Sequence, residues 1–444
     1  MFTTRCFQLI LFTVLSLCMV LTPPVYAKGE REVTLEEAYH SALKHNELIS
    51  ASASRIDQAR EDIRIARAPM LPQIQLQGRS IRRKETSIVP GQNGGTGGTV
   101  PTFPDRYNEL SLHGSQILFQ GGQLMLGVAA SRHVARRSEF EDYRTRQQIL
   151  FTVSNSFYNV LFARRSSEIA ESQLSRARQH LELAEQRYQV GLVERTAVLR
   201  AQVEVAAAME TMEQARNNYA ISMEQLALEM GIPAPPDSVK EPDEIKLDNI
   251  PVETHLEYAF KNRRDLMASE RGLLAVQKQV EAERRSFFPT LSIEGTYSRV
   301  DDDAVYYGDD YTWQAALVLT YPLFTGLRDT AQIARARASE SEMQAAFNRI
   351  KQEIRVDVRS AYANIQTRKQ MVRFFDDQLK SANANYEQVN AMFREGLVTT
   401  IDVMDAQTAL TEAEQGLASA YYQLQLDKQS LLLATGVFQQ TLIN

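Results

Sequence analysis

Cysteine is nearly absent from this chain of 444 residues, which contains only Cys6 and Cys18. Both lie within residues 1–27, a segment with a basic start, a central apolar run and a small-residue ending at Ala27. These features are typical of a cleaved export signal. We therefore expect the exported protein to have no thiol, no disulfide and no thiolate metal site. Lipidation of Cys18 is the alternative, and it is disfavoured because a bulky Leu17 precedes it.

Beyond this segment the sequence also lacks long apolar runs, basic clusters and catalytic motifs. No stretch approaches the roughly 18 apolar residues of a membrane-spanning helix, so contact with a membrane is expected only through strands or at a surface. The formal net charge of −6 argues against a nucleic-acid-binding protein. The six histidines are scattered, and no Ser-His-Asp set, phosphate loop or metal motif is recognisable. We therefore expect neither enzymatic activity nor a cofactor.

Proline is missing from residues 105–232 and from every position after Pro322. Because an interior proline costs a helix about 3 kcal/mol, these two stretches are predicted to be long helices. Residues 123–190 alone would form about 100 Å of helix at about 1.5 Å per residue. Their apolar stripe has helical spacing, so the helices are expected to pair along their length. The stripe consists of Ile149, Val153, Phe157 and Val160.

The chain repeats itself with an offset of 205 residues, which relates Gly121 to Gly326 and Gly191 to Gly396. Each copy is predicted to contain a helix, a strand pair, a glycine turn and a long helical hairpin. The first repeat, 28–251, has predicted strands at 72–80 and 107–119, a helical hairpin at 122–230 and a connector at 231–251. The second repeat, 252–444, has predicted strands at 289–299 and 311–322, a helical hairpin at 326–435 and a short tail.

The four predicted strands alternate apolar and polar residues, as in the run from Leu291 to Tyr297. Such alternation is typical of a transmembrane β-barrel strand, with aromatic residues near its ends at the membrane interfaces. A half-buried sheet of a soluble protein is the alternative that the pattern leaves open. Four strands are too few to close a barrel, and open strand edges are not tolerated in lipid. Several chains are therefore expected to share one barrel, and a trimer would supply twelve strands.

Several short motifs occur in a fixed order along the two copies. They are Thr34 to Ala38, the Pro-Xaa-Leu/Ile strand starts, Leu118 to Gly121, Arg187 to Val193, Leu323 to Gly326 and Phe393 to Val398. Together with the export signal, this ordered set resembles the TolC-like outer-membrane factors, or outer membrane efflux proteins. The resemblance implies a mainly α fold with a small β part. Long helical hairpins would form a periplasmic α-barrel, and four strands per chain would contribute to a shared trimeric 12-stranded outer-membrane β-barrel.

The resemblance also implies a function and its partners. A homotrimeric channel-tunnel in the outer membrane of a Gram-negative bacterium, extending into the periplasm, would passively conduct substrates to the exterior. It would receive them from a periplasmic adaptor (membrane fusion protein) and an inner-membrane transporter, in a tripartite efflux or type I secretion system. The alternative is a periplasmic coiled-coil adaptor or structural protein without a pore. Such an adaptor should have one hairpin beside a compact β-rich domain, whereas this chain has two hairpins.

Both helical hairpins have the same Gly-Leu-Val tip, formed by Gly191, Leu192 and Val193 in the first copy and by Gly396, Leu397 and Val398 in the second. Glycine permits a sharp turn with positive φ, and the apolar residues after it are expected to be exposed for a partner to cover. With the resemblance, this pattern predicts adaptor docking at the tips. A plain helix C-cap is the alternative, which explains the glycines but not the repeated Leu-Val pair.

Asp402 and Asp405 follow the second tip three positions apart, so on a helix they share one face. In a trimer they would form two rings of carboxylates that repel, attract cations and raise one another's pKa. The resemblance implies that they line a periplasmic gate and help to hold it closed. A solvated helix face, or charge favoured at a helix N-terminus, is the alternative. The first copy has Ala197 and Arg200 at the corresponding positions, so a gate contact there must use other groups.

Overall fold

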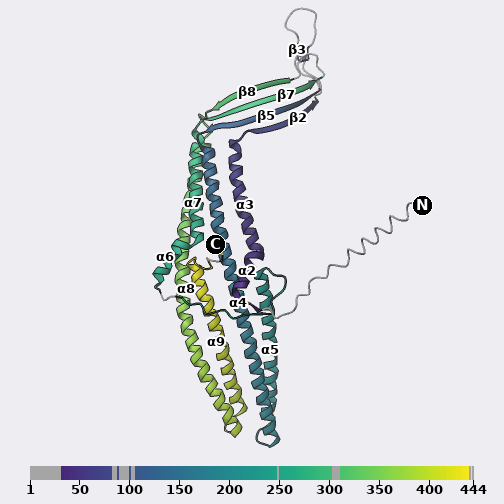
Figure 1. Cartoon of the computed structure of the whole chain (residues 1–444), viewed down its shortest axis with the longest axis vertical. Coiled ribbons are helices and arrows are strands. Elements are labelled where there is room, and N and C mark those ends of the chain that lie inside the picture. The colour runs from purple at the N-terminus through teal and green to yellow at the C-terminus, as the bar shows by residue number, and fades with distance from the viewer. Residues whose placement is uncertain are drawn as a thin grey trace, which may run out of the picture.

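The computed structural model describes residues 32–82, 88–89, 100–101, 106–247, 250–302, 311–439 and 442. The export signal expected in residues 1–27, with both cysteines, lies outside the described residues. Figure 1 shows an elongated chain with a curved sheet at one end and long helices that run from it to two hairpin tips at the other. Short helices lie against the long ones at about mid-height. The predicted fold class, mainly α with a small β part, is confirmed.

The helices and strands occur in the same order in the two copies. The first copy contains β1 (Glu32–Val33), α2 (Leu35–His45), α3 (Glu47–Arg67), the 3-10 helix η1 (Ala68–Met70), β2 (Gln73–Arg82), β3 (Ile88–Val89), β4 (Val100–Pro101), β5 (Arg106–Gln120), α4 (Gln123–Gln189) and α5 (Arg195–Met230). The second contains β6 (Ser238–Val239) in the connector, α6 (Val252–Asn262), α7 (Arg264–Glu283), η2 (Arg284–Phe287), β7 (Thr290–Asp302), β8 (Tyr311–Thr320), α8 (Arg328–Glu395) and α9 (Thr400–Ala434).

Two offsets relate the copies in the structure. Before the outer loops the offset is 217 residues, as from Leu35 at the start of α2 to Val252 at the start of α6. After the loops it is 205 residues, as from Gln123 at the start of α4 to Arg328 at the start of α8. The difference, 217 minus 205, means that the first outer loop is 12 residues longer. Equivalent positions can therefore be compared along the whole duplication.

All four helices of the long hairpins end at a glycine with positive φ, at positions 191, 231, 396 and 436. In each case the amide of the following residue donates to a carbonyl five residues back, as from Leu192 to Arg187. This is the Schellman pattern, which satisfies carbonyls that the end of a helix leaves unpaired. The same local signal thus stops the helices in both copies.

The first segment of each copy is two helices, where the sequence predicted one. The breaks fall at Asn46 and Arg263, which are extended with ψ of 122° and 116°. Gly231 and Gly436 lie against the backbones at these breaks, and at the first break the side chain of Asn46 also caps α3 by accepting from the amide of Leu48. A Cβ on Gly231 would come within 2.6 Å of the carbonyl of His45, and one on Gly436 within 2.9 Å of the amide of Arg263. The end of each hairpin therefore packs directly on a break, and only glycine fits there.

The main hydrophobic core lies at mid-height, where the short helices pack against the long ones. The predicted stripe on α4 is buried there, and none of its four residues is more than 6% exposed. Tyr39 of α2 packs edge-on against Phe438, with 6.3 Å between ring centroids. Its hydroxyl also forms a 2.5 Å hydrogen bond with the hydroxyl of Ser154 on α4. These contacts fix the base from which the hairpins extend.

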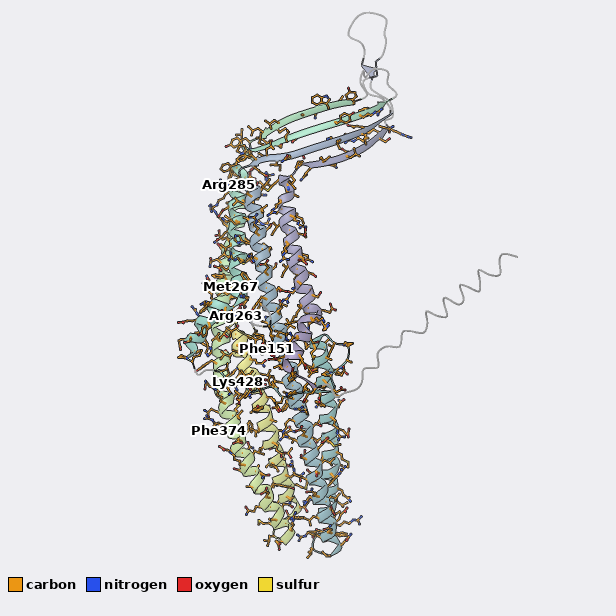
Figure 2. The ribbon with its side chains drawn as sticks, viewed as in Figure 1. Phe151, Arg263, Met267, Arg285, Phe374 and Lys428 are labelled. Atoms are coloured by element: carbon orange, nitrogen blue, oxygen red, sulfur yellow. The ribbon has the colours of Figure 1, made fainter. Side chains whose placement is uncertain are left out.

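Two buried cations form ion pairs near mid-height, and Figure 2 labels both. Arg263 donates to Asp265 at 2.5 Å and to Asp357 on α8 at 2.6 Å. Lys428 on α9, which is 4% exposed, donates to Glu244 of the connector at 2.8 Å. Burial works to raise the pKa of Asp265, but the hydrogen bonds and charge of Arg263 outweigh it and lower that pKa. Only the cations are fully buried, so removing a carboxylate partner would leave an uncompensated buried charge.

The four long strands form one antiparallel sheet in the order β2, β5, β7, β8. Each copy supplies one hairpin, and the two hairpins meet where β5 pairs with β7. Strands β2 and β8 therefore form the two edges of the described sheet. None of the helices in the described part of the chain is both long and apolar enough to span a membrane.

Candidate functional site

One face of the sheet is apolar and exposed. Its residues, each between 43% and 73% exposed, are Ile74, Leu76, Leu110, Leu112, Ile293, Tyr297, Trp313, Leu317 and Leu319. The register places apolar residues opposite one another on this side, for example Tyr297 and Trp313. The other face is polar, and there the ring of His113 forms hydrogen bonds with Ser111 at 3.0 Å and Thr296 at 3.1 Å. The sheet therefore suits an apolar medium on one side and water on the other.

The two hairpin tips have the same backbone. Gly191 and Gly396 have φ of +76° and +84°, a region that favours glycine. Next to them Leu192 is 64% exposed and Leu397 is 70% exposed. Val193 and Val398, which the sequence predicted to be exposed as well, are half-buried. Each tip thus presents one fully exposed leucine beside a partly covered valine.

Asp402 and Asp405 lie in the first turns of α9, and both are exposed. The carboxylate of Asp402 accepts hydrogen bonds from the amide and the hydroxyl of Thr399, each at 2.7 Å. This contact completes a capping box at the start of α9. The hydrogen bonds from Thr399 lower the pKa of Asp402. Within one chain, then, Asp402 stabilises a helix N-terminus, and the raised pKa predicted for a ring of carboxylates would need further copies.

Arg187 begins one of the family motifs, but no sequence pattern predicted its role, which is to join the two hairpins near their tips. It is 9% exposed on α4, and its guanidinium donates to the main-chain carbonyls of Phe393 and Arg394 at the end of α8. It also lies 5.1 Å from the ring centroid of Phe393. A cation at the C-terminus of a helix is favourable because unpaired carbonyls point toward it. One sequence signal could have identified it: Arg187 corresponds to Met392, so the copies differ there.

His180, two turns of α4 before Arg187, packs on the same phenylalanine. Its ring centroid is 4.8 Å from that of Phe393, and it is 5% exposed. Neither ring nitrogen has a hydrogen-bond partner among the described residues. Burial lowers the pKa of His180, because the imidazolium would lose its contact with water. His180, Phe393 and Arg187 together form what we call the tip joint.

Further from the tips, α4 also contacts α9. Arg176 forms an ion pair with Glu414 at 3.0 Å and donates to the hydroxyl of Thr411 at 3.1 Å. The side-chain amide of Gln407 donates to the carbonyl of Gln173 at 3.2 Å. Polar contacts therefore connect the first hairpin to the second along the length between the core and the tip joint.

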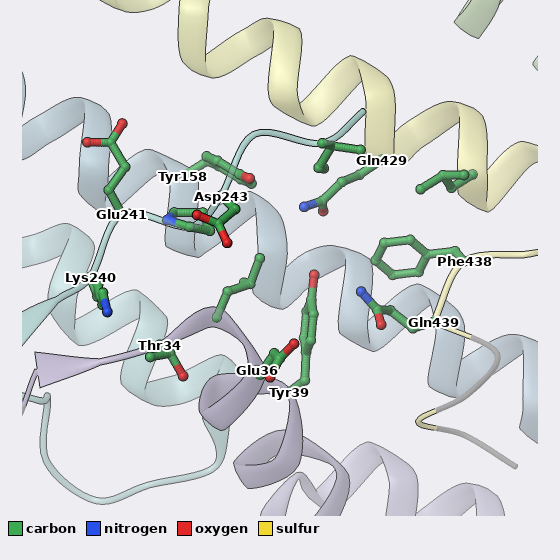
Figure 3. A pocket seen from close by; sticks show the side chains of 14 residues that line it. Thr34, Glu36, Tyr39, Tyr158, Lys240, Glu241, Asp243, Gln429, Phe438 and Gln439 are labelled. Atoms are coloured by element: carbon green, nitrogen blue, oxygen red, sulfur yellow. The ribbon is translucent and has the colours of Figure 1, made fainter. Parts of the chain in front are cut away.

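A cleft of about 530 Å³ lies at mid-height, where Figure 3 shows side chains converging from α2, α4, α9 and the connector. Among them are Tyr39, Tyr158, Glu241, Asp243 and Gln429. Burial raises the pKa of Tyr39 to about 12, and it also raises the pKa of Tyr158. Both hydroxyls are therefore neutral hydrogen-bonding groups near pH 7. Their position beside the core suits a role in packing the connector.

The family model described as "Outer membrane efflux protein" matches residues 38–231 and 256–437. The chain therefore belongs to the outer membrane efflux protein family. Outer membrane protein TolC of Escherichia coli (strain K12) is 23% identical over 432 residues, which cover 91% of this chain and 83% of TolC. Outer membrane efflux protein BepC of Brucella suis is 23% identical over 405 residues, with 91% and 85% covered.

Solved outer-membrane channels have the same fold. The match to CmeC of Campylobacter jejuni has a TM-score of 0.78 at 18% identity and covers 92% of this chain and 86% of CmeC. The match to VceC of Vibrio cholerae has a TM-score of 0.75 at 20% identity, with 90% and 96% covered. The predicted family resemblance and outer-membrane location are thus confirmed. The family is one of transport proteins, and the chain is an outer-membrane efflux channel component.

Proposed function

We propose that three copies of this chain assemble into an outer-membrane channel that continues into a periplasmic helical tunnel. The channel conducts substrates passively from an inner-membrane transporter and a periplasmic adaptor, as in tripartite efflux or type I secretion. We assign the chain no catalytic step, since the transporter supplies the energy. The observation that carries the proposal is the sheet, which has an exposed apolar face and two edges without a strand partner in the described chain.

Both properties of the sheet require further copies. Unpaired strand edges in lipid leave amide and carbonyl groups that each cost several kcal/mol. Four strands cannot close on themselves, because familiar membrane barrels have about eight or more. Three chains of four strands give the twelve that the family resemblance implies. The polar face with His113 then lines the lumen, and the apolar face contacts lipid.

The tips supply the proposed contacts with partners. Leu192 and Leu397 are exposed apolar groups at the end furthest from the sheet, which suits docking of a periplasmic adaptor. Asp402 and Asp405 lie directly beside the second tip, so a ring of three copies would surround the tunnel mouth with carboxylates. We infer that this ring forms the gate. A pore-free adaptor is disfavoured, because the family match covers both hairpins and the sheet has a hairpin from each copy.

A charge placed on each face of the sheet tests the proposal. Leu317→Arg puts the charge on the apolar face, where it should cost about 2–4 kcal/mol if that face lies in lipid. Gln314→Arg is the matched control, because it puts the same charge on the polar face of the same strand. We expect the first variant to lose most of its heat-resistant trimer in outer-membrane extracts and the second to retain it.

The opposite result would come from a sheet bathed in water. There Leu317 is already 67% exposed, so both variants should differ from the parent by less than about 0.5 kcal/mol. Equal recovery of the two variants, or a soluble monomer in the periplasm, would therefore contradict a membrane channel. Ion conduction by the parent in planar bilayers completes the test.

A further inference from the structure

The two edge strands are duplicates of the two strands that pair at the centre of the sheet. The offset of 205 relates β5 to β8, and the offset of 217 relates β2 to β7. At the centre, β5 pairs with β7 in one register from Tyr107 opposite Asp302 to Ile117 opposite Ser292, and after a shift at Leu118 the pairing continues to Gln120 opposite Thr290. We call this contact between the end of one hairpin and the start of the next the inner seam. A β8 strand and a β2 strand from different chains have the same relationship.

The two hairpins are identical in register, which makes the comparison quantitative. In the first copy Gln73 pairs with Ser115, and in the second their counterparts Thr290 and Thr320 pair. The same correspondence holds along all ten pairs of each hairpin. Because the two hairpins match, the pairing that joins β5 to β7 can also join β8 of one chain to β2 of another.

The residues that follow β8, at the edge of the sheet, have more open space around them than their counterparts at the inner seam. A Cβ on Gly121 would come within 2.5 Å of Phe288 across the inner seam, whereas its counterpart Gly326 has nothing within 4 Å. Phe119 is 48% exposed and its counterpart Phe324 is 82% exposed. Residues 116, 117, 119 and 120 of β5 pair only with β7, on either side of a register shift at Leu118. The equivalent positions, 321–325, follow the end of β8, and they would need a β2 strand from another chain to extend it.

The helices show the same asymmetry. Ile169 on α4 is 3% exposed, but its counterpart Phe374 on α8 is 67% exposed and is labelled on the outer side in Figure 2. Ala282 on α7 is 3% exposed, and its counterpart Ile65 on α3 is 68% exposed. Within the chain, α4 packs on α7 toward the sheet and on α9 toward the tips. Their duplicates are α8, α3 and α5, and Figure 1 shows α8 on the opposite side of the chain from α3 and α5.

We propose that β8 of one subunit pairs with β2 of the next in the register of the inner seam. Transferring that register by the two offsets places Leu319 opposite Gly78 of the next subunit and Thr320 opposite Gln77 of the next subunit. Gly326 then receives Leu71 of the next subunit, which is 62% exposed in the single chain, as Gly121 receives Phe288. This inference rests on the proposed trimer and specifies which residues pair between its subunits.

The faces of the sheet agree with this register. Leu319 and Gly78 both belong to the apolar side, and Thr320 and Gln77 both belong to the polar side. A slip of one residue would join the face of β8 that holds Leu319 to the face of β2 that holds Gln77. A slip of two residues would keep the faces aligned, so an experiment must separate it from the proposed register.

Disulfide trapping makes that separation. A chain with Thr320→Cys and Gln77→Cys should cross-link between subunits, because residues directly opposite in an antiparallel pair have Cα atoms about 4.5–5.5 Å apart, within disulfide range. The matched control, Thr320→Cys with Arg79→Cys, corresponds to the slip of two residues and separates the sulfurs too far. Ser115→Cys with Glu294→Cys reproduces the pair across the inner seam, and it should close within one chain. The unsubstituted chain gives the background.

Oxidised outer-membrane samples are compared on denaturing gels without reductant. We expect Thr320→Cys with Gln77→Cys to give covalent dimers and trimers at least about tenfold more than the control pair. If the control pair cross-links better, or if neither pair cross-links while the mass in detergent is that of a trimer, the register is wrong and the assembly stands. A monomeric mass would overturn the seam and the proposed function together.

Discussion

The two hairpin tips share one backbone conformation but differ in the charged and polar side chains near it. Both end a long helix with the same glycine turn, and both expose a leucine. The first tip supplies Arg187 and His180, whose counterparts in the second copy are Met392 and Asn385. The second supplies Asp402 and Asp405, whose counterparts are Ala197 and Arg200. The groups that connect the hairpins or face the proposed gate are therefore present in only one copy each.

This difference shows which features a duplicated fold must keep. The turn glycines and the helix stops are required twice, because each hairpin has to reverse its own chain. A contact between the hairpins is formed once within the chain, so one copy needs the donor and the other the acceptor. Arg187 can bind the carbonyls at the end of α8, whereas Met392 at the equivalent position has no charge to offer. The tip joint is one-sided for this reason.

The largest effect is expected from Arg187→Met, which gives the first copy the residue of the second. The variant removes charge-assisted hydrogen bonds to carbonyls at the end of α8, each worth about 1.5–3 kcal/mol. We expect hydrogen exchange of the amides near Phe393 to rise about 10- to 100-fold. If the tip joint keeps the proposed gate closed, conductance in planar bilayers rises as well.

Arg187→Lys is the matched control for this prediction. It keeps a cation near the carbonyls but loses the planar guanidinium that reaches two of them, so it should give an intermediate exchange rate. Exchange that is unchanged in Arg187→Met would show that α8 ends without help from the first hairpin. Faster exchange with unchanged conductance would show that the tip joint does not keep the proposed gate closed.

The sequence predicted the regular parts of the molecule from local signals. Missing prolines indicated α4 and α8, and alternation indicated strands such as 72–80, where β2 is Gln73–Arg82. The break at Asn46 was missed because no proline or glycine marks it, and the packing of Gly231 on it comes from a distant helix end. Arg187 and His180 were missed because their partner is Phe393, more than 200 positions away. Periodicity reports which face of a helix is buried but not which helix buries it.

A smaller effect on the tip joint is expected when the pH is lowered, and it depends on His180, which only the first copy has. Its pKa lies below the ordinary value of about 6.5 when the tip joint is closed. Opening therefore favours proton uptake, so the tip joint is stable above about pH 6.5 and weakens as the pH falls toward the lowered pKa. One proton changes the equilibrium by at most about tenfold per pH unit. The measurement is the protection factor of the Phe393 amide between about pH 7.5 and 5.5.

The charged groups around His180 support this direction of the pH dependence. Arg187 lies on the same phenylalanine ring, and Arg394 lines the adjoining cleft, so a second positive charge is unfavourable there. Glu182 lines the same cleft and works in the opposite direction, and Tyr386 is neutral because burial raises its pKa. His180→Asn, which gives the first copy the residue of the second, should remove the pH dependence because an amide side chain does not titrate. A protection factor that still falls with pH in this variant would assign the effect to another group.

The smallest effect is expected at the mouth of the proposed channel, where Asp405 and its counterpart Arg200 carry opposite charges at equivalent heights. Both are exposed, and exposed charges interact by about 0.2–1 kcal/mol, so each changes the local ion concentration by up to about fivefold. We expect Asp405→Asn to lower the preference for cations over anions and Arg200→Gln to raise it, measured as reversal potentials in planar bilayers.

Asp405 is the better choice for this test because Asp402 also completes the capping box of α9, so its loss would disturb the helix start. Asp405→Ala and Asp405→Asn should act alike if charge is the cause. In a trimer the opening would then hold three Asp405 carboxylates from the second tips and three Arg200 guanidiniums from the first. If neither substitution changes the selectivity, Asp405 and Arg200 lie outside the conducting path, and the proposed gate does not include them.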